Sequence, residues 1–203
     1  KYEHCNVLYI VGKPKVISVK TSAGEVRRRE GDINCGTGNL DQQRAQIAGN
    51  RFAVTSFKWD GYGNLQTIEG PQGSGGSLKL IYDYDKLTNT YPVEIYNKSY
   101  ELTSKADYYV AGGDYSGLYY GKPLATFDVN GNEIKYSYDS NGRTATILGP
   151  QEIQEDQPWT IKFTYAPYLN TEPGATGAAS WAKTEHADRS INSSGQVSYK
   201  AND

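Results

Sequence analysis

The chain has 203 residues with a formal net charge of -2 at pH 7, and 37% of its residues are hydrophobic. This charge lacks the basic excess with which proteins bind nucleic acid electrostatically, so no nucleic-acid partner is expected. No apolar run reaches the roughly 20 residues that a membrane-spanning helix needs, so no membrane-spanning segment is expected either.

The aromatic and glycine content favours an extended β protein. The chain contains 18 Tyr and only 4 Phe, together with 22 Gly and no Met. Tyr suits a thin sheet, because its ring packs on one side while its hydroxyl reaches water or a backbone partner. The many glycines predict frequent turns. Because Met is absent even at position 1, we expect the sequence to be one piece of a larger protein.

The N-terminal segment alternates apolar and polar residues from Tyr2 to Lys20, which predicts two strands around Gly12–Pro14. Cys5 and Cys35 could pair or stay free, and their spacing does not decide; we favour buried free thiols. His4 stands beside Cys5, but two Cys and one His are too few for a closed zinc site. We therefore expect no metal and no cofactor.

Two features follow before residue 50. The cluster Arg27–Arg29 is flanked by acidic residues, so local ion pairing is the expectation and a phosphate or partner site the alternative. From Asn39 to Ala48 we predict a short helical turn, since Leu40, Gln43, Arg44 and Ile47 would share one helix face.

A segment then occurs twice in the same register: residues 57–71 align without a gap on residues 136–150. In each copy, alternating aromatic residues predict a strand, the Asp side chain caps a turn, and Gly accepts the positive φ of a tight hairpin. A second alternating run and Gly-Pro close the unit. The residues expected to carry this structural repeat are Trp59, Asp60, Gly63, Gly70, Pro71, Tyr136, Tyr138, Asp139, Gly142, Arg143, Gly149 and Pro150.

Further units are predicted around this pair. A related turn at Asp128–Asn132 extends the second copy to residues 124–150, and diverged copies are expected at 78–96 and 159–170. The whole chain, 1–203, is taken as a single repeat-type β region, because units too small to bury an apolar face alone must stack on their neighbours. Between the units we predict a flexible connector at Gly70–Gly76, a loop at Glu172–Ala179, and a polar tail from Ser190 to Asp203 that is poorly ordered at its end.

Candidate catalytic groups are few. Asp83 and Asp85 share one strand face and could form a glycosidase-like carboxylate pair, but turn capping explains such Asp residues more simply. A His-based triad would depend on His4 or His186, and no Gly-x-Ser-x-Gly elbow supports one. We expect no catalytic residues and no enzyme activity.

The pattern aromatic-x-Tyr-Asp-x-x-Gly-Arg, clearest at Tyr138–Arg143, resembles the YD repeat of the Rhs family. The stretches Glu25–Asp32, Thr37–Leu40 and Trp59–Leu65 are similar to the middle region of the B component of bacterial insecticidal toxin complexes, and Trp181–Asp188 is similar to a segment just beyond it in the same proteins. The resemblance departs from the pattern where Trp59 replaces Tyr, where Asn64 stands in the place of Arg, and where the segment after Asp85 lacks the turn Gly.

This resemblance implies an all-β fold of antiparallel hairpins stacked into an open, curved sheet, as one segment of a hollow β-shell. It also implies a secreted bacterial protein whose partners are the remainder of its own polypeptide shell, companion toxin subunits and an enclosed toxin domain. Two alternatives remain open: an extracellular carbohydrate-binding or adhesin-type module that uses Trp59 or Trp181, and a β-rich glycoside hydrolase that uses Asp83 and Asp85.

Overall fold

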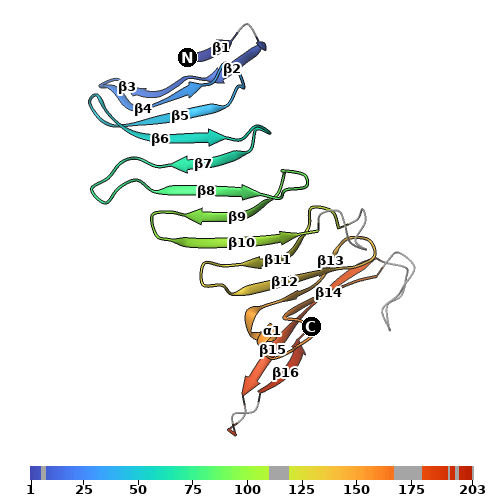
Figure 1. Ribbon diagram of the computed structural model, residues 1–203. Coiled ribbons are helices and arrows are strands. Elements are labelled where there is room, and N and C mark those ends of the chain that lie inside the picture. The colour runs from blue at the N-terminus through green and yellow to red at the C-terminus, as the bar shows by residue number, and fades with distance from the viewer. Residues whose placement is uncertain (6–7, 110–118, 167–179, 192, 195–196, 203) are drawn as a thin grey trace. The chain divides into compact units, whose positions relative to one another are not determined.

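The computed structural model describes residues 1–5, 8–109, 119–166, 180–191, 193–194 and 197–202. The strands of the large sheet follow one another in chain order from β3 to β16 (Figure 1), neighbouring strands such as β3 and β4 or β15 and β16 are antiparallel, and the order does not close on itself. The predicted all-β fold, an open sheet of consecutive antiparallel hairpins, is confirmed. The chain divides into two compact units, Lys1–Ser104 and Lys105–Asp203.

The first unit begins with a separate two-stranded sheet, β1 paired with β2, and continues with the meander that starts at β3. Alternating apolar and polar residues build these strands, and Gly or Asn residues with positive φ build several of the turns between them. The strands are β1 Tyr2–Cys5, β2 Ile10–Pro14, β3 Val16–Thr21, β4 Gly24–Ile33, β5 Leu40–Ala48, β6 Arg51–Trp59, β7 Leu65–Glu69, β8 Lys79–Tyr84 and β9 Pro92–Asn97. Strand β10, Leu102–Tyr108, crosses the boundary between the units.

The second unit continues the same meander and adds one short helix. Helix α1 begins at Pro150 and precedes β14, while the longest strand, β15, pairs with β16 as a terminal hairpin. The elements are β11 Pro123–Phe127, β12 Glu133–Tyr138, β13 Thr144–Leu148, α1 Pro150–Gln154, β14 Ile161–Ala166, β15 Trp181–Ile191 and β16 Val197–Asn202.

The two segments that match in sequence pair in the same register. In the first, Phe57 lies opposite Ile68 and Trp59 opposite Leu65; in the second, Tyr136 lies opposite Ile147 and Tyr138 opposite Thr144. In both, the register shifts at the aromatic residue before the turn. A register shift also occurs at the last residue of the first strand in the β4–β5, β8–β9 and β10–β11 pairs, namely at Ile33, Tyr84 and Tyr108.

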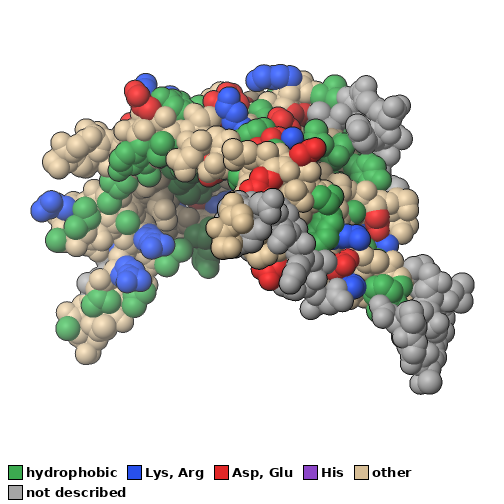
Figure 2. All heavy atoms as spheres, turned by 90° about the horizontal axis from the view of Figure 1, so that it is seen from below, with side chains coloured by type: hydrophobic (Ala, Val, Ile, Leu, Met, Phe, Trp, Pro, Cys, Tyr) green, Lys and Arg blue, Asp and Glu red, His purple; other side chains and the backbone are tan. Residues whose placement is uncertain are grey.

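Little of the side-chain surface is fully buried. The accessible area is 13786 Å², whereas a compact monomer of this mass exposes about 9,400 Å². Among the described residues, the buried hydrophobic ones are Cys5, Ala125 and Ala166, and no side chain is below 2% exposed. Large apolar side chains such as Ile17 and Val26 are exposed, and Figure 2 shows hydrophobic side chains at the surface among charged ones. The sheet is therefore a single layer through most of its length.

One sequence-based prediction of local structure is wrong. The segment expected as a helical turn is strand β5, which is paired along both edges with β4 and β6, so sheet hydrogen bonding outweighs the helix propensity of its Gln, Arg and Ala residues. The polar tail predicted from Ser190 contains strand β16, paired with β15, and residue 203 at its end lies outside the described residues. The connector Gly70–Gly76 contains a hydrogen-bonded turn between Gly73 and Gly76. The loop predicted at 172–179 lies outside the described residues.

The expectation of free thiols is also wrong. Cys5 of β1 and Cys35 of the β4–β5 turn form a disulfide, with their Cα atoms 5.4 Å apart. Packing of the β1–β2 hairpin against β4 brings them together across 30 residues of sequence, a proximity that spacing alone does not reveal. The disulfide fastens the β1–β2 hairpin to the large sheet.

Candidate functional site

The turn between β6 and β7 is organised by one carboxylate. Asp60 Oδ1 accepts hydrogen bonds from the backbone N–H groups of Tyr62 (2.9 Å) and Asn64 (2.8 Å), while Oδ2 accepts one from the Asn64 side chain (3.0 Å). The backbone N–H of Gly63 donates to the Asp60 carbonyl at 3.2 Å, and Gly63 has φ +88°. The positive φ explains why glycine is needed at this position.

The turn between β12 and β13 repeats this arrangement. Asp139 Oδ1 accepts from the backbone of Asn141 and Arg143, and Oδ2 accepts from Arg143 Nε at 2.8 Å. Asn64 therefore fills the place of Arg143, because its amide donates to the same carboxylate oxygen as the guanidinium does. This departure from the repeat pattern keeps the hydrogen bond.

The turn at Asp128, between β11 and β12, has the same bonds. Asp128 accepts from the backbone of Asn130 and Asn132 and from the Asn132 side chain. The side chain of the residue after the turn Gly thus donates to the turn carboxylate, and the predicted repeat residues include this position at Arg143 but not at Asn64 or Asn132. The shared signal was available: a side-chain donor follows the Gly in all of these turns.

The diverged turn at Asp85 is also capped by its carboxylate, although it contains no glycine. Asp85 accepts hydrogen bonds from the backbone N–H groups of Thr88 (2.6 Å), Thr90 (2.9 Å) and Tyr91 (2.9 Å) and from the Thr88 hydroxyl. Asn89, with φ +52°, takes the positive-φ position that Gly holds elsewhere. The carboxylate of Asp85 is committed to the turn, and Asp85 is only 6% exposed.

These hydrogen bonds lower the pKa of the turn carboxylates. Burial alone would raise the pKa of Asp60, Asp85 and Asp139, but the donors that surround each carboxylate outweigh it and the pKa falls below its usual value. At Asp128 the Asn132 side chain is the largest cause of the lowered pKa. Each carboxylate is therefore held ionised as a turn cap and is a poor proton donor for catalysis.

The aromatic residue before each of three turn aspartates joins its hairpin to the preceding one. Trp59 Nε1 donates to the carbonyl of Leu40 (3.0 Å), Tyr84 Oη to the carbonyl of Leu65 (3.0 Å), and Tyr138 Oη to the carbonyl of Pro123 (2.8 Å). Every acceptor is the first residue of the strand that follows the previous turn on the same edge. Trp59 therefore replaces Tyr without loss of this bond. We call these three bonds the aromatic links.

Additional aromatic packing surrounds Tyr138. The rings of Tyr109 and Tyr119 lie 5.9 and 5.8 Å from its ring, and the Lys122 ammonium lies 5.0 Å from its centroid. Burial raises the pKa of Tyr138 to about 12, so its hydroxyl stays protonated as a donor. The Arg143 guanidinium lies 4.1 Å from the ring centroid of Tyr165 on β14, which adds a cation–π contact.

The Gly-Pro pairs that end the two matched segments have different surroundings. The Gly70 N–H donates to the Leu78 carbonyl, and Pro71 leads into the β7–β8 turn. The Gly149 N–H donates to Thr160 Oγ1, and Pro150 is the first residue of α1. Both pairs stop a strand, but only the second starts a helix.

The other candidate groups do not come together as a catalytic site. Asp83 is exposed on β8 while Asp85 caps its turn, and His4 and His186 are exposed. Arg28 pairs with Glu30, which also pairs with Arg44, so the middle residue of the basic cluster makes a local ion pair. Among the described residues, no group of three or more His, Cys, Asp and Glu could hold a metal ion.

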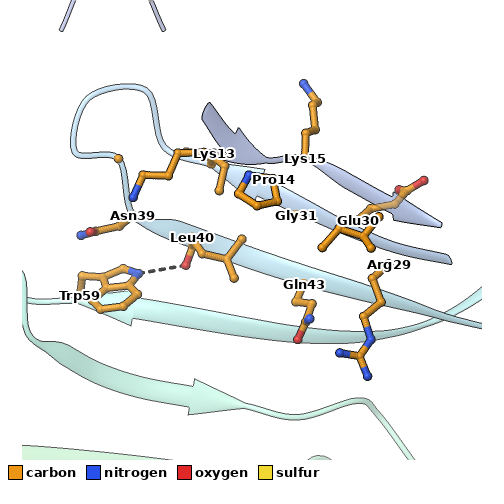
Figure 3. A pocket seen from close by; sticks show the side chains of 13 residues that line it. Lys13, Pro14, Lys15, Arg29, Glu30, Gly31, Asn39, Leu40, Gln43 and Trp59 are labelled. Atoms are coloured by element: carbon orange, nitrogen blue, oxygen red, sulfur yellow. Dashed lines mark hydrogen bonds between the residues drawn. The ribbon is translucent and has the colours of Figure 1, made fainter. Parts of the chain in front are cut away.

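A pocket of 420 Å³ lies between the β1–β2 hairpin and the face of the first unit's sheet. Figure 3 shows Pro14 on the hairpin and Leu40 on β5, with Trp59 and its hydrogen bond to the Leu40 carbonyl at one side of the cavity. Gly31 permits this close packing, because a Cβ there would lie 2.9 Å from Leu40 Cδ1 and 3.3 Å from the Pro14 carbonyl oxygen. We call this cavity the Trp59 pocket. The sequence did not predict it, since its walls come from five strands.

Comparisons with known proteins include a similarity in sequence and a similarity in structure. No protein-family model matches the chain. The chain is 26% identical over 125 residues to the pheromone-processing carboxypeptidase kex1 of Schizosaccharomyces pombe (strain 972 / ATCC 24843), a match that covers 59% of this chain and 22% of the carboxypeptidase. It is structurally similar to a chain in the crystal structure of TcdB2-TccC3-Cdc42, with a TM-score of 0.46 and 12% identity, over 92% of this chain and 9% of that chain. The chain thus spans less than a quarter of either protein.

In the part of the chain that the structure describes, no helix is long and apolar enough to cross a membrane.

Proposed function

We propose that this chain is a structural, non-catalytic segment of an Rhs-like or toxin-complex-like β-shell, which encloses a toxic C-terminal domain and helps to deliver it. Its partners are then the remainder of the shell, companion toxin subunits and the enclosed domain. The repeat residues of the hairpins serve to build the wall, and no substrate is turned over.

The aromatic links are the observation that carries this proposal. Trp59 and Tyr84 each bond the backbone of the hairpin before their own, and Tyr138 does the same in the second unit. A hairpin of this kind derives stability from its neighbours instead of from an interior of its own. The large accessible area of the chain agrees with such a wall.

The two ends of the sheet support assembly into something larger. Strands β3 and β16 are the outermost strands of the order, and an edge strand presents unpaired N–H and C=O groups to another chain. On β3, Ile17 and Val19 are 57% and 52% exposed. An exposed apolar edge strand promotes aggregation of a free protein, whereas in a segment of a larger sheet it pairs with a further strand.

Secretion is part of the proposal. The disulfide between Cys5 and Cys35 supports it, because disulfides persist in extracellular and periplasmic compartments and are rare in reducing ones.

Electron cryo-microscopy of the natural polypeptide that contains this sequence tests the shell function. We expect strands to continue from the β3 or β16 edge into further hairpins that surround enclosed density. A separate domain with both edges facing solvent, and no enclosed density, would refute the proposal.

The glycosidase alternative has less support, because Asp85 is fully hydrogen bonded within its turn. A panel of chromogenic glycosides tests it directly. We expect no hydrolysis above the rate of the Asp83→Asn variant; hydrolysis that this substitution abolishes would contradict a non-catalytic role.

A further inference from the structure

We propose that the Trp59 pocket is a binding site for an acidic saccharide. The pocket, at 420 Å³, lies within the range of roughly 300–1,000 Å³ typical of small-molecule sites. The proposal goes beyond the shell function and does not depend on it, since it concerns one face of the first unit only.

The first argument is the apolar wall. Trp59, Leu40, Ile33 and Pro14 line the pocket. The indole N–H of Trp59 is held by the Leu40 carbonyl at 3.0 Å, so the ring is fixed and offers its aromatic surface instead of its donor. A fixed aromatic ring beside aliphatic groups accommodates the C–H face of a sugar ring at small entropic cost.

The second argument is a set of uncommitted polar side chains around that wall. Within the described residues, Asn39, Gln43, Lys13 and Arg29 line the pocket and have no side-chain hydrogen bond or ion pair. Figure 3 shows Lys13 and Asn39 near Trp59, with Gln43 and Arg29 further along the sheet. Carboxamides both donate and accept, which is the capacity needed for sugar hydroxyls.

The third argument is charge. The uncommitted ionic groups are both cations, Lys13 and Arg29, whereas the nearby carboxylates are already neutralised. Glu30 is bonded by Arg28 and Arg44, which hold its pKa below the usual value. A guanidinium and an ammonium with no partner favour a carboxylate on the ligand. The two carboxamides favour a polyhydroxylated ligand over a fatty acid, so the combination points to an acidic sugar such as a uronic or sialic acid.

The fourth argument is that the pocket is preformed in the absence of a ligand. Its outer wall, Lys13 to Lys15, belongs to the hairpin that the disulfide fastens to the sheet. The Gly31 N–H also donates to the Lys15 carbonyl at 2.8 Å, which seats the hairpin on β4. A wall held by a covalent bond and a backbone hydrogen bond lowers the ordering cost of binding.

Isothermal titration calorimetry on the purified chain tests the proposal. The acidic probes are sialyllactose and a hyaluronan hexasaccharide; the neutral probe is lactose, and dodecanoate represents an apolar carboxylate. We expect at least one acidic sugar to bind, with lactose and dodecanoate weaker by about tenfold or more, which corresponds to about 1.4 kcal/mol. No binding of either acidic sugar at millimolar concentration, or stronger binding of dodecanoate or lactose, would overturn the proposal.

Matched variants locate the site. Arg29→Gln is expected to lower the affinity for the acidic sugar by about tenfold. Gln43→Ala is expected to lower this affinity also. Arg27→Gln, on the same strand two residues away and outside the pocket lining, is the control and is expected to leave affinity unchanged. Equal effects of the two arginine substitutions would refute the site. These positions avoid Trp59, whose replacement also breaks an aromatic link.

Removal of the disulfide tests whether the acidic sugar binds inside a pocket or on a flat aromatic surface. We expect the affinity for the acidic sugar to fall in the Cys35→Ser variant, because the hairpin that carries Lys13 is then released from the sheet. Unchanged affinity would show that the ligand does not lie between hairpin and sheet.

Discussion

Replacing Asp85 by Asn tests whether the turn carboxylate stabilises its hairpin. In the native turn both carboxylate oxygens accept hydrogen bonds, Oδ1 from Thr90 and Tyr91 and Oδ2 from Thr88 at 2.6 Å. The Asn side chain keeps one oxygen as a hydrogen-bond acceptor. In place of the other oxygen it has an NH2 group, which then faces a backbone N–H donor. A hydrogen bond to a charged group contributes about 1.5–3 kcal/mol, so we expect the free energy of unfolding to fall by about 2–3 kcal/mol.

Urea denaturation followed by circular dichroism measures this change. Asp83→Asn is the control, because Asp83 is the same residue type two positions earlier and is exposed; its effect should be within about 0.5 kcal/mol. If both variants lose the same stability, the turn carboxylate has no special role and the account of the turns is wrong.

The pH dependence gives an independent check with a definite sign. The pKa of Asp85 is lowered in the folded chain, since hydrogen bonds from Tyr91, Thr88 and Thr90 outweigh the effect of burial. The unfolded chain therefore binds the proton first, and stability is lost as pH falls below about 4. The Asp85→Asn variant should lose less stability than the wild type over the same acid range. A larger loss in the variant would contradict the lowered pKa.

The remaining predictions concern the aromatic links, the turn glycines and the disulfide. Tyr138→Phe removes one donor and should cost about 1 kcal/mol in urea denaturation; no cost would mean that this link adds nothing to stability. Gly63→Ala should destabilise by about 1–2 kcal/mol because Gly63 has φ +88°, whereas Gly61→Ala in the same turn should be nearly neutral; equal effects would contradict the strain. Reducing the disulfide closed by Cys5 and Cys35 should cost about 3–4 kcal/mol, seen as a lower midpoint in urea; an unchanged midpoint would contradict this.

The hairpins and their register could be predicted because their determinants are local. Asp60 and Gly63 lie within one turn, and a capping carboxylate with a positive-φ residue fixes that turn without reference to the rest of the chain. The alternating strands on either side then pair in the one register that places their apolar side chains on the same face of the sheet. The order of strands follows from the same locality, since a meander pairs each strand with its neighbours in sequence.

The features that sequence did not predict depend on partners far along the chain. Strand β5 contains Gln43, Arg44 and Ala45, which favour a helix in isolation, and only pairing with β4 and β6 makes it a strand. The disulfide and the Trp59 pocket require the β1–β2 hairpin to lie against the sheet. That contact depends on Gly31, whose missing side chain leaves no pattern in a single sequence.

The preference for Tyr over Phe in this chain follows from the single-layer sheet. In a thick core an aromatic ring is surrounded on all sides, and a hydroxyl would be a cost unless paired. Here a ring covers one hairpin and its polar atom reaches the backbone of the next, as Tyr84 and Tyr138 do. Where a hairpin carries such a link, part of its stability comes from the neighbouring hairpin and not from the volume of a core.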